Sequence, residues 1–305
     1  MKTKYFLLAV AAISMAACSN DESVEQVNDA DVINFQASID SPQTRADRDA
    51  TDLQATYFET GEEVNIGIAP TSTTSYTYAV YTADAHATNA NDFTLKGGET
   101  ALRWPTSGNI DLVAFHPSTV TATTTEFPVQ TNQSTSDDYR ASDLMAATKL
   151  TNVAKTSSPV AFTFNHMLSK VVVNLTAGPG ITSGDLAATT VEIKTIKTAA
   201  FDGTKWSAKD GESTEWITLG TGANTTAIIV PQIIDYTSTP IDFIRITVGT
   251  NSPVVWQTSV DRTFTANTIN TYNLTINMSS ITLTSTEIAN WTSTGGDTDT
   301  DAVTL

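Results

Sequence analysis

The stretch VINFQASIDSPQTRADR, residues 32–48, joins an alternating apolar and polar half to a wholly different, mostly polar half. In its first half, apolar residues alternate with polar ones, and the apolar set is Ile33, Phe35, Ala37 and Ile39. This period of two predicts a half-buried β-strand. The second half, residues 41–48, is polar and contains Pro42, so it predicts an exposed segment that proteases can reach.

The composition of the chain favours an all-β fold. The 305 residues correspond to about two domains at roughly 150 residues each. Hydrophobic residues make up 40%, enough for real cores, and the abundant Thr and Val favour strands. Short strand-like runs recur about every ten residues without a convincing amphipathic helix, which predicts two β-sandwiches.

The net charge of −17 bears on the kind of partner. A surface this acidic repels phosphate backbones and anionic lipids, which argues against nucleic-acid binding. The same charge keeps a secreted protein soluble, and this is the simpler explanation for it.

The N-terminus has the pattern of an export signal. Lys2 and Lys4 precede a short apolar run that ends in small residues, so residues 1–17 are expected to be a signal peptide. Cys18 is the only cysteine, and together with Met15-Ala16-Ala17 it resembles a bacterial lipobox. That resemblance implies cleavage before Cys18 and acylation of its sulfur and amine. The alternative is an ordinary signal peptide with an incidental cysteine.

The expected domain organisation follows from these segments. Residues 18–45 form an acidic tether and the first strand, residues 46–158 the N-terminal sandwich, and residues 159–305 the C-terminal sandwich. The boundary is placed after residues 149–158, a polar run that ends at Pro159. Residues 131–142 are expected to be a polar loop, and residues 109–117 a strand buried on both faces.

The sequence contains no recognisable catalytic or cofactor motif. His86, His116 and His166 are isolated from other metal ligands, and a hydrogen-bonded histidine at a strand end is expected for the last two. Asp297, Asp299 and Asp301 alternate as in a calcium loop but lack its glycine and distal glutamate. The chain is therefore expected to be no enzyme and to need no cofactor or metal.

Several stretches together resemble the fimbrillin family, the type V pilins of Gram-negative surface pili. They are the lipobox, the first strand followed by Thr44-Arg45-Ala46, LVAFHP at 112–117, Asp143-Leu144-Met145, Phe164-x-His166-x-Leu168-Ser169-Lys170-Val171, Val230-Pro231-Gln232, NTINTYNLTI at 267–276, and Ile288-x-x-Trp291. The resemblance spans nearly the whole mature chain, and the combination is specific although no single motif is.

The resemblance implies two tandem transthyretin-like β-sandwiches of Greek-key type and a structural role without catalysis. It also implies a lipoprotein precursor at the outer membrane, which an arginine-specific protease cuts after the first strand. Arg45, before Ala46, is the matching position, and Arg48 is a second candidate. The strand carrying Ile33, Phe35, Ala37 and Ile39 then leaves, and a strand from another pilin subunit takes its place in a surface pilus.

The C-terminal tail departs from the family pattern. Residues 292–305 would supply the donated strand, but their apolar residues cluster only at Ala302, Val303 and Leu305. The donor could instead include residues 281–291, or this subunit could be a tip or accessory pilin that only accepts a strand, with an adhesive role at the tip. The competing hypothesis is a monomeric surface lipoprotein that binds glycan or a host ligand and keeps its first strand. An exposed aromatic platform would favour that alternative.

Overall fold

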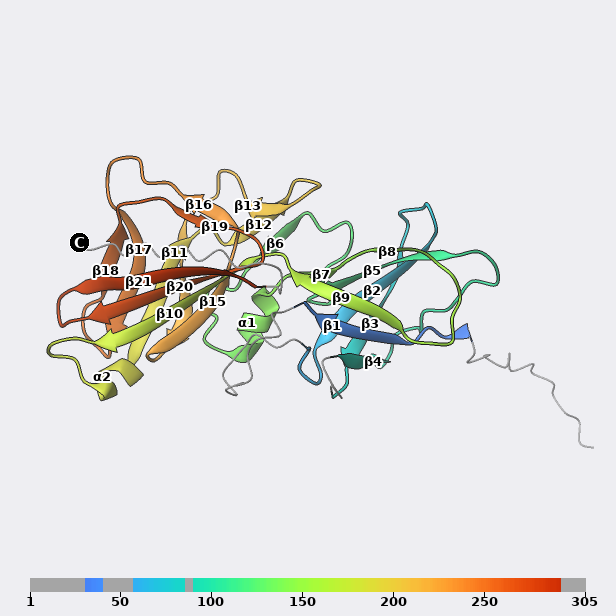
Figure 1. Ribbon diagram of the computed structural model, residues 1–305, viewed down its shortest axis with the longest axis horizontal. Coiled ribbons are helices and arrows are strands. Elements are labelled where there is room, and N and C mark those ends of the chain that lie inside the picture. The colour runs from blue at the N-terminus through green and yellow to red at the C-terminus, as the bar shows by residue number, and fades with distance from the viewer. Residues whose placement is uncertain (1–30, 41–56, 86–89, 292–305) are drawn as a thin grey trace, which may run out of the picture.

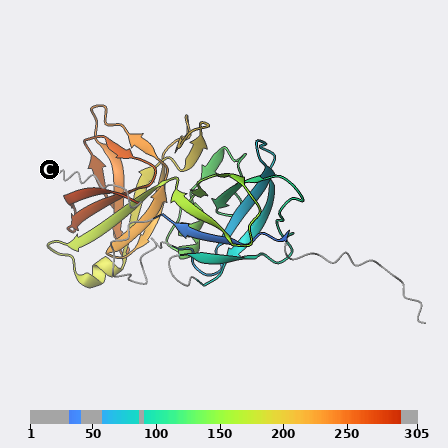
Figure 2. The same cartoon turned by 45° about the vertical axis from the view of Figure 1, so that its right-hand side comes forward.

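The computed structural model describes residues 31–40, 57–85 and 90–291, and within them the chain is almost entirely β (Figure 1). The strands form two lobes that lie side by side in both views (Figures 1 and 2). The first lobe contains the blue-to-green strands and the second the yellow-to-red strands. No helix in the described residues has the length and apolar character needed to cross a membrane.

One eight-stranded sheet builds the first lobe. Its strands are β1 (Phe35–Ile39), β2 (Glu63–Pro70), β3 (Thr77–Ala83), β4 (Asn91–Leu95), β5 (Ile110–His116), β7 (Met145–Ala147), β8 (Leu150–Val153) and β9 (Val160–His166). Their order is β2-β3-β4-β1-β9-β7-β5-β8, and β2 also pairs with β5. The β2–β5 pairing joins the first strand of this order to the last but one, so the seven strands from β2 to β5 form a closed ring around one hydrophobic core, with β8 outside the ring beside β5.

Two four-stranded sheets build the second lobe. The first contains β15 (Asn224–Ile229), β10 (Ser169–Ala177), β20 (Thr268–Ile276) and β21 (Ile281–Asn290) in that order. The second contains β14 (Glu215–Thr221), β11 (Thr189–Thr195), β17 (Ile241–Val248) and β18 (Val254–Thr258). Aromatic rings pack between the sheets: Phe243 of β17 meets Tyr272 of β20 with ring centroids 5.3 Å apart. This lobe is therefore a two-layer sandwich.

The two lobes repeat one pairing scheme. In the first lobe, β1 lies between antiparallel β4 and parallel β9; in the second, β10 lies between antiparallel β15 and parallel β20. The order β3-β2-β5-β8 of the first lobe corresponds likewise to β14-β11-β17-β18 of the second. β1 is thus the counterpart of β10, the first strand of the second lobe.

Small elements complete the fold. β6 (Glu126–Pro128) pairs with β12 (Thr198–Phe201), which pairs with β13 (Trp206–Ala208), while β16 (Gln232–Ile234) pairs with β19 (Arg262–Phe264). The described part of the chain contains two short helices, α1 (Ser136–Ser142) and α2 (Ser183–Ala187). In α1 the Thr135 hydroxyl accepts a hydrogen bond from the Asp138 amide, an N-cap that local composition alone did not reveal. The expectation of a loop over residues 131–142 was therefore wrong for α1.

The expected boundary after residue 158 also differs from the structure. Residues 149–158 contain β8, which pairs with β5, and β9 lies in the first sheet beside β1. The buried side chains of Val160, Phe162 and Phe164 belong to the first core, whereas Leu168 belongs to the second. The chain therefore passes from the first sheet to the second core between His166 and Leu168. By contrast, the prediction that β5 is buried on both faces is confirmed.

Candidate functional site: the slot around the first strand

β1 fills a position inside the first sheet, which we call the β1 slot: the space between β4 and β9. The alternation predicted from the sequence is present, because Ile33, Phe35, Ala37 and Ile39 are each no more than 7% exposed. The polar residues between them are half-buried or exposed. β1 therefore carries three of the four predicted side chains into the core, and Ile33, two residues before the strand, is the fourth.

Backbone hydrogen bonds hold the strand along both sides. β1 makes three residue pairs with β4 and five with β9. Beyond the ends of β1, the Ile33 amide donates to the Leu102 carbonyl at 3.0 Å, and the Asp40 amide donates to the Phe164 carbonyl at 2.8 Å. Removal of β1 would leave the facing edges of β4 and β9 unpaired, and would open the ring.

Aromatic side chains line the β1 slot. The Phe35 ring meets the edge of Tyr81 at a centroid distance of 4.9 Å and lies 6.0 Å from Phe162. Phe162 contacts Phe164, and Phe164 meets Phe58 at 5.0 Å. These rings come from β1, β3, β9 and the segment before β2. Several elements of the first lobe therefore build the apolar lining of the slot together.

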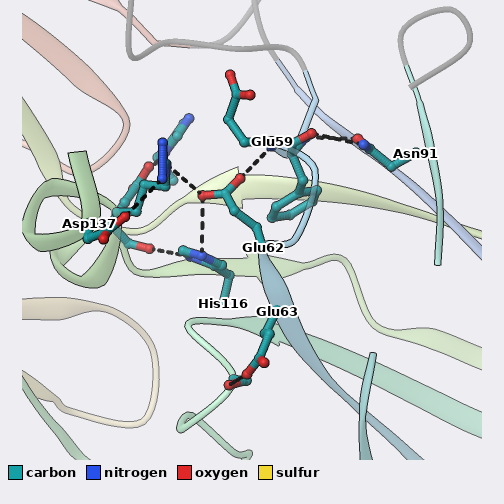
Figure 3. Close-up of polar contacts among 11 residues, drawn as sticks. Glu59, Glu62, Glu63, Asn91, His116 and Asp137 are labelled. Atoms are coloured by element: carbon teal, nitrogen blue, oxygen red, sulfur yellow. Dashed lines mark hydrogen bonds and ion pairs between the residues drawn. The ribbon is translucent and has the colours of Figure 1, made fainter. Parts of the chain in front are cut away.

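A buried amide fixes one wall of the slot. Asn91, opposite Ala37 in the β1–β4 register, is fully buried. Its side chain accepts a hydrogen bond from the Phe58 amide at 2.8 Å and donates to the Phe58 and Asp84 carbonyls (Figure 3). This residue could not be predicted from the sequence, because an Asn at the start of a short strand gives no local signal of burial.

A polar cluster lies next to this wall. The Glu62 carboxylate accepts a hydrogen bond from the Glu59 amide at 2.6 Å and lies 3.4 Å from Arg140 Nε and 3.9 Å from His116 Nε2 (Figure 3). Burial raises the pKa of the Glu62 carboxyl above its usual value, although His116 and Arg140 act in the opposite direction. The cluster borders an open cavity of about 570 Å³ that includes Asp137.

Two of the isolated histidines meet in this region. His116 Nδ1 lies 2.9 Å from the Asp143 carbonyl oxygen, and His166 Nδ1 lies 2.8 Å from the Asp143 carboxylate. His116 ends β5 and His166 ends β9, so the prediction of hydrogen-bonded histidines at strand ends is confirmed. The His166 ring stacks on Trp291 of the second lobe at a centroid distance of 3.5 Å. The described residues contain no group of three side chains suited to hold a metal ion.

Other predicted site residues lie outside the described residues. These are Cys18, Arg45, Ala46, Arg48, Ala302, Val303 and Leu305, together with His86 and the alternating Asp297, Asp299 and Asp301. The structure therefore bears on the slot and its walls.

The chain was compared with known proteins. The family model described as fimbrillin-like matches residues 44–291, a span that begins after β1. A Bacteroides uniformis protein with the provisional name fimbrium subunit Fim1C is 36% identical over 126 residues. That alignment spans 39% of this chain and 39% of the relative.

Solved structures share the fold. A crystal structure of a provisionally assigned cell adhesion protein from Bacteroides uniformis is 25% identical, covers 88% of this chain and 100% of its own, and has a TM-score of 0.64. A similarly described protein from Bacteroides ovatus is 16% identical, covers 85% of this chain and 97% of its own, and has a TM-score of 0.61, a likeness of fold alone. With a family model matched over most of its length, the chain belongs to the fimbrillin-like family.

Proposed function

We propose that this protein is a structural subunit of a cell-surface pilus, assembled when its first strand is removed and a neighbouring subunit's strand enters the vacated slot. One observation carries the proposal. β1 is buried between two neighbouring strands, and Thr44-Arg45-Ala46 begins five residues after its last residue, Ile39. A cut there separates β1 covalently from the rest of the lobe.

The energetics favour replacement over a permanently empty slot. Burying four apolar side chains like those of β1 contributes about 5 kcal/mol or more at about 25 cal/mol per Å². A strand from another chain restores this burial and pairs with the free edges of β4 and β9, which is β-augmentation.

The repeated pairing scheme supports the removal of β1 in particular. Its counterpart β10 makes six residue pairs with β15 and eight with β20, against three and five for β1. Fewer hydrogen-bonded pairs hold β1, so less must be broken when it leaves. The same repeat supports a description of the chain as two tandem transthyretin-like sandwiches of Greek-key type.

Maturation is part of the proposal. Residues 1–17 direct export, Cys18 carries the lipid that anchors the precursor to the outer membrane, and an arginine-specific protease cuts after Arg45 or Arg48. The protein then leaves the membrane for the surface pilus, where its partners are other pilin subunits. No catalytic activity or cofactor is part of this role.

The tail is the proposed donor, with Ala302, Val303 and Leu305 as its apolar side chains. The alternative donor, residues 281–291, is less favourable because β21 makes nine residue pairs with β20 and Trp291 is only 1% exposed. Moving β21 would break those pairs, whereas using residues 292–305 would leave β21 in place.

The N-terminus and intact mass of protein sheared from its native cell surface test the proposal. We expect a start at Ala46, without lipid, in the polymer. The double variant Arg45→Lys with Arg48→Lys keeps the charge but removes both candidate arginines, so it should block assembly, and the two single variants show which arginine is cut. A lipidated Cys18 with residues 19–45 intact would overturn the proposal and support the monomeric, ligand-binding lipoprotein instead.

A further inference from the structure

A second cavity, of about 380 Å³, lies between the lobes and away from the β1 slot. Its floor includes Phe115, Ala146 and Asn165, which are neighbours in the register of β5, β7 and β9. The β12–β13 hairpin borders it from the second lobe. We call it the interlobe cavity. No residue of β1 lines it.

The lining of the interlobe cavity carries no charged side chain. This is notable in a chain with a net charge of −17, and it contrasts with the cavity beside Glu62, which Glu63, Asp137 and Arg140 also line. A charged ligand would lose its hydration in the interlobe cavity without gaining a counter-charge. The cavity therefore favours an uncharged ligand.

Two aromatic rings stand at the β12–β13 side of the cavity. Phe201 and Trp206 pair directly across the hairpin, and their ring centroids are 5.2 Å apart at an interplanar angle of 36°. Phe201 is 37% exposed, and Trp206 is half-buried. Large aromatic side chains left this accessible beside a concave apolar surface offer a flat face for a ligand.

Polar side chains accompany these rings. Thr148, Thr204 and Asn165 line the cavity, the two threonines exposed and Asn165 half-buried. A wholly apolar ligand would take these groups out of water without offering them a hydrogen bond, which is unfavourable. The lining therefore matches a ligand that combines an apolar face with hydroxyl or amide groups at its edge.

We propose that the interlobe cavity binds a neutral pyranose sugar, such as the terminal residue of a glycan. A pyranose has a face of C–H groups that can pack on Trp206 and Phe201. Its ring of hydroxyls can exchange hydrogen bonds with Thr148, Thr204 and Asn165. The volume lies within the usual range for small-molecule sites, roughly 300–1,000 Å³.

Saturation-transfer NMR on the full chain tests this assignment. The probes are the methyl glycosides of glucose, galactose, mannose and N-acetylglucosamine, with glucuronic acid as the charged sugar and indole as an apolar probe without hydroxyls. We expect transfer to at least one neutral glycoside and none to glucuronic acid.

Two variants locate the binding. Trp206→Ala should weaken it by about tenfold or more through loss of the aromatic face. Ala146→Leu should do the same by filling the floor while leaving the hairpin intact. Trp216→Ala is the matched control, because that half-buried tryptophan packs under Arg245 in the second lobe and does not line the cavity. Thermal unfolding of each variant confirms that it is folded.

The outcomes separate clearly. Binding of a neutral glycoside that both cavity variants lose and Trp216→Ala keeps supports the proposal. The proposal is overturned if no neutral glycoside binds, if only indole binds, or if the folded Trp206→Ala and Trp216→Ala variants bind equally well. None of these results depends on cleavage at Arg45, so failure here leaves the pilin proposal standing.

Discussion

At the scale of single residues, Glu62 links stability to pH. Burial raises the pKa of its carboxyl in the folded state above the usual value of 4.5, so the folded chain holds this proton more tightly than the unfolded chain does. The resulting stabilisation is complete below the unfolded pKa and is lost as pH rises through the folded pKa. We therefore expect Glu62→Gln to gain stability relative to wild type between about pH 4 and pH 7.

Urea unfolding at those two pH values measures the effect. Glu63→Gln is the matched control, because the neighbouring carboxylate pairs with Lys96 at the surface, 2.8 Å away, and is part of no buried cluster. A Glu62→Gln difference that stays constant with pH, or that reverses in sign, would contradict the assignment.

Replacement of Asn91 is expected to destabilise the folded chain. Asn91→Ala leaves the Phe58 amide, the Phe58 carbonyl and the Asp84 carbonyl without their side-chain partner in a buried wall of the β1 slot. We expect a loss of about 2–4 kcal/mol in the free energy of unfolding. Asn174→Ala, which removes one half-buried contact with Asn273, should lose only about 1 kcal/mol. Chemical denaturation measures both variants. If Asn91→Ala and Asn174→Ala lose the same free energy of unfolding, the wall of the slot does not depend on Asn91.

At the scale of elements, the β1 slot should accept its own strand as a separate peptide. A chain that begins at Ala46 lacks β1, and we expect a peptide of residues 31–40 to bind it and raise its melting temperature, because the peptide restores the pairs with β4 and β9. A peptide with Phe35→Ala should bind more weakly, with a loss of up to about 3–5 kcal/mol. A melting temperature that neither peptide changes would argue against an open, receptive slot.

Strands with a local sequence pattern could be predicted, whereas pairings between distant strands could not. β1 was predictable because its alternation is a local pattern, and β5 because it contains an unbroken apolar run, residues 112–115. β8 was missed because Leu150 and Val153 are its only apolar residues. The membership of β9 in the first sheet could not be predicted, since it pairs with a strand more than 120 residues earlier. The meeting of His116 and His166 at Asp143 is equally non-local.

At the scale of the whole molecule, the stack of His166 on Trp291 ties the end of the first sheet to the end of the second lobe. Trp291→Ala should remove this contact and a fully buried side chain, with a loss of about 3–5 kcal/mol. We expect calorimetry to resolve separate transitions for the lobes in this variant. Trp291→Phe, which keeps a ring at the position, should stay closer to a single transition. A single, unshifted transition in Trp291→Ala would contradict a role in coupling the lobes.

The position of β1 between two neighbours has a mechanical consequence. A strand pulled along its own axis loads the hydrogen bonds on both sides in shear, so many must break together, whereas a strand peeled from a sheet edge loses them one at a time. Both neighbouring strands, the parallel β9 and the antiparallel β4, lie along this axis. Any strand seated there would resist tension along its own axis, and its lifetime under load would depend on the unfolding rate of the lobe rather than on equilibrium affinity.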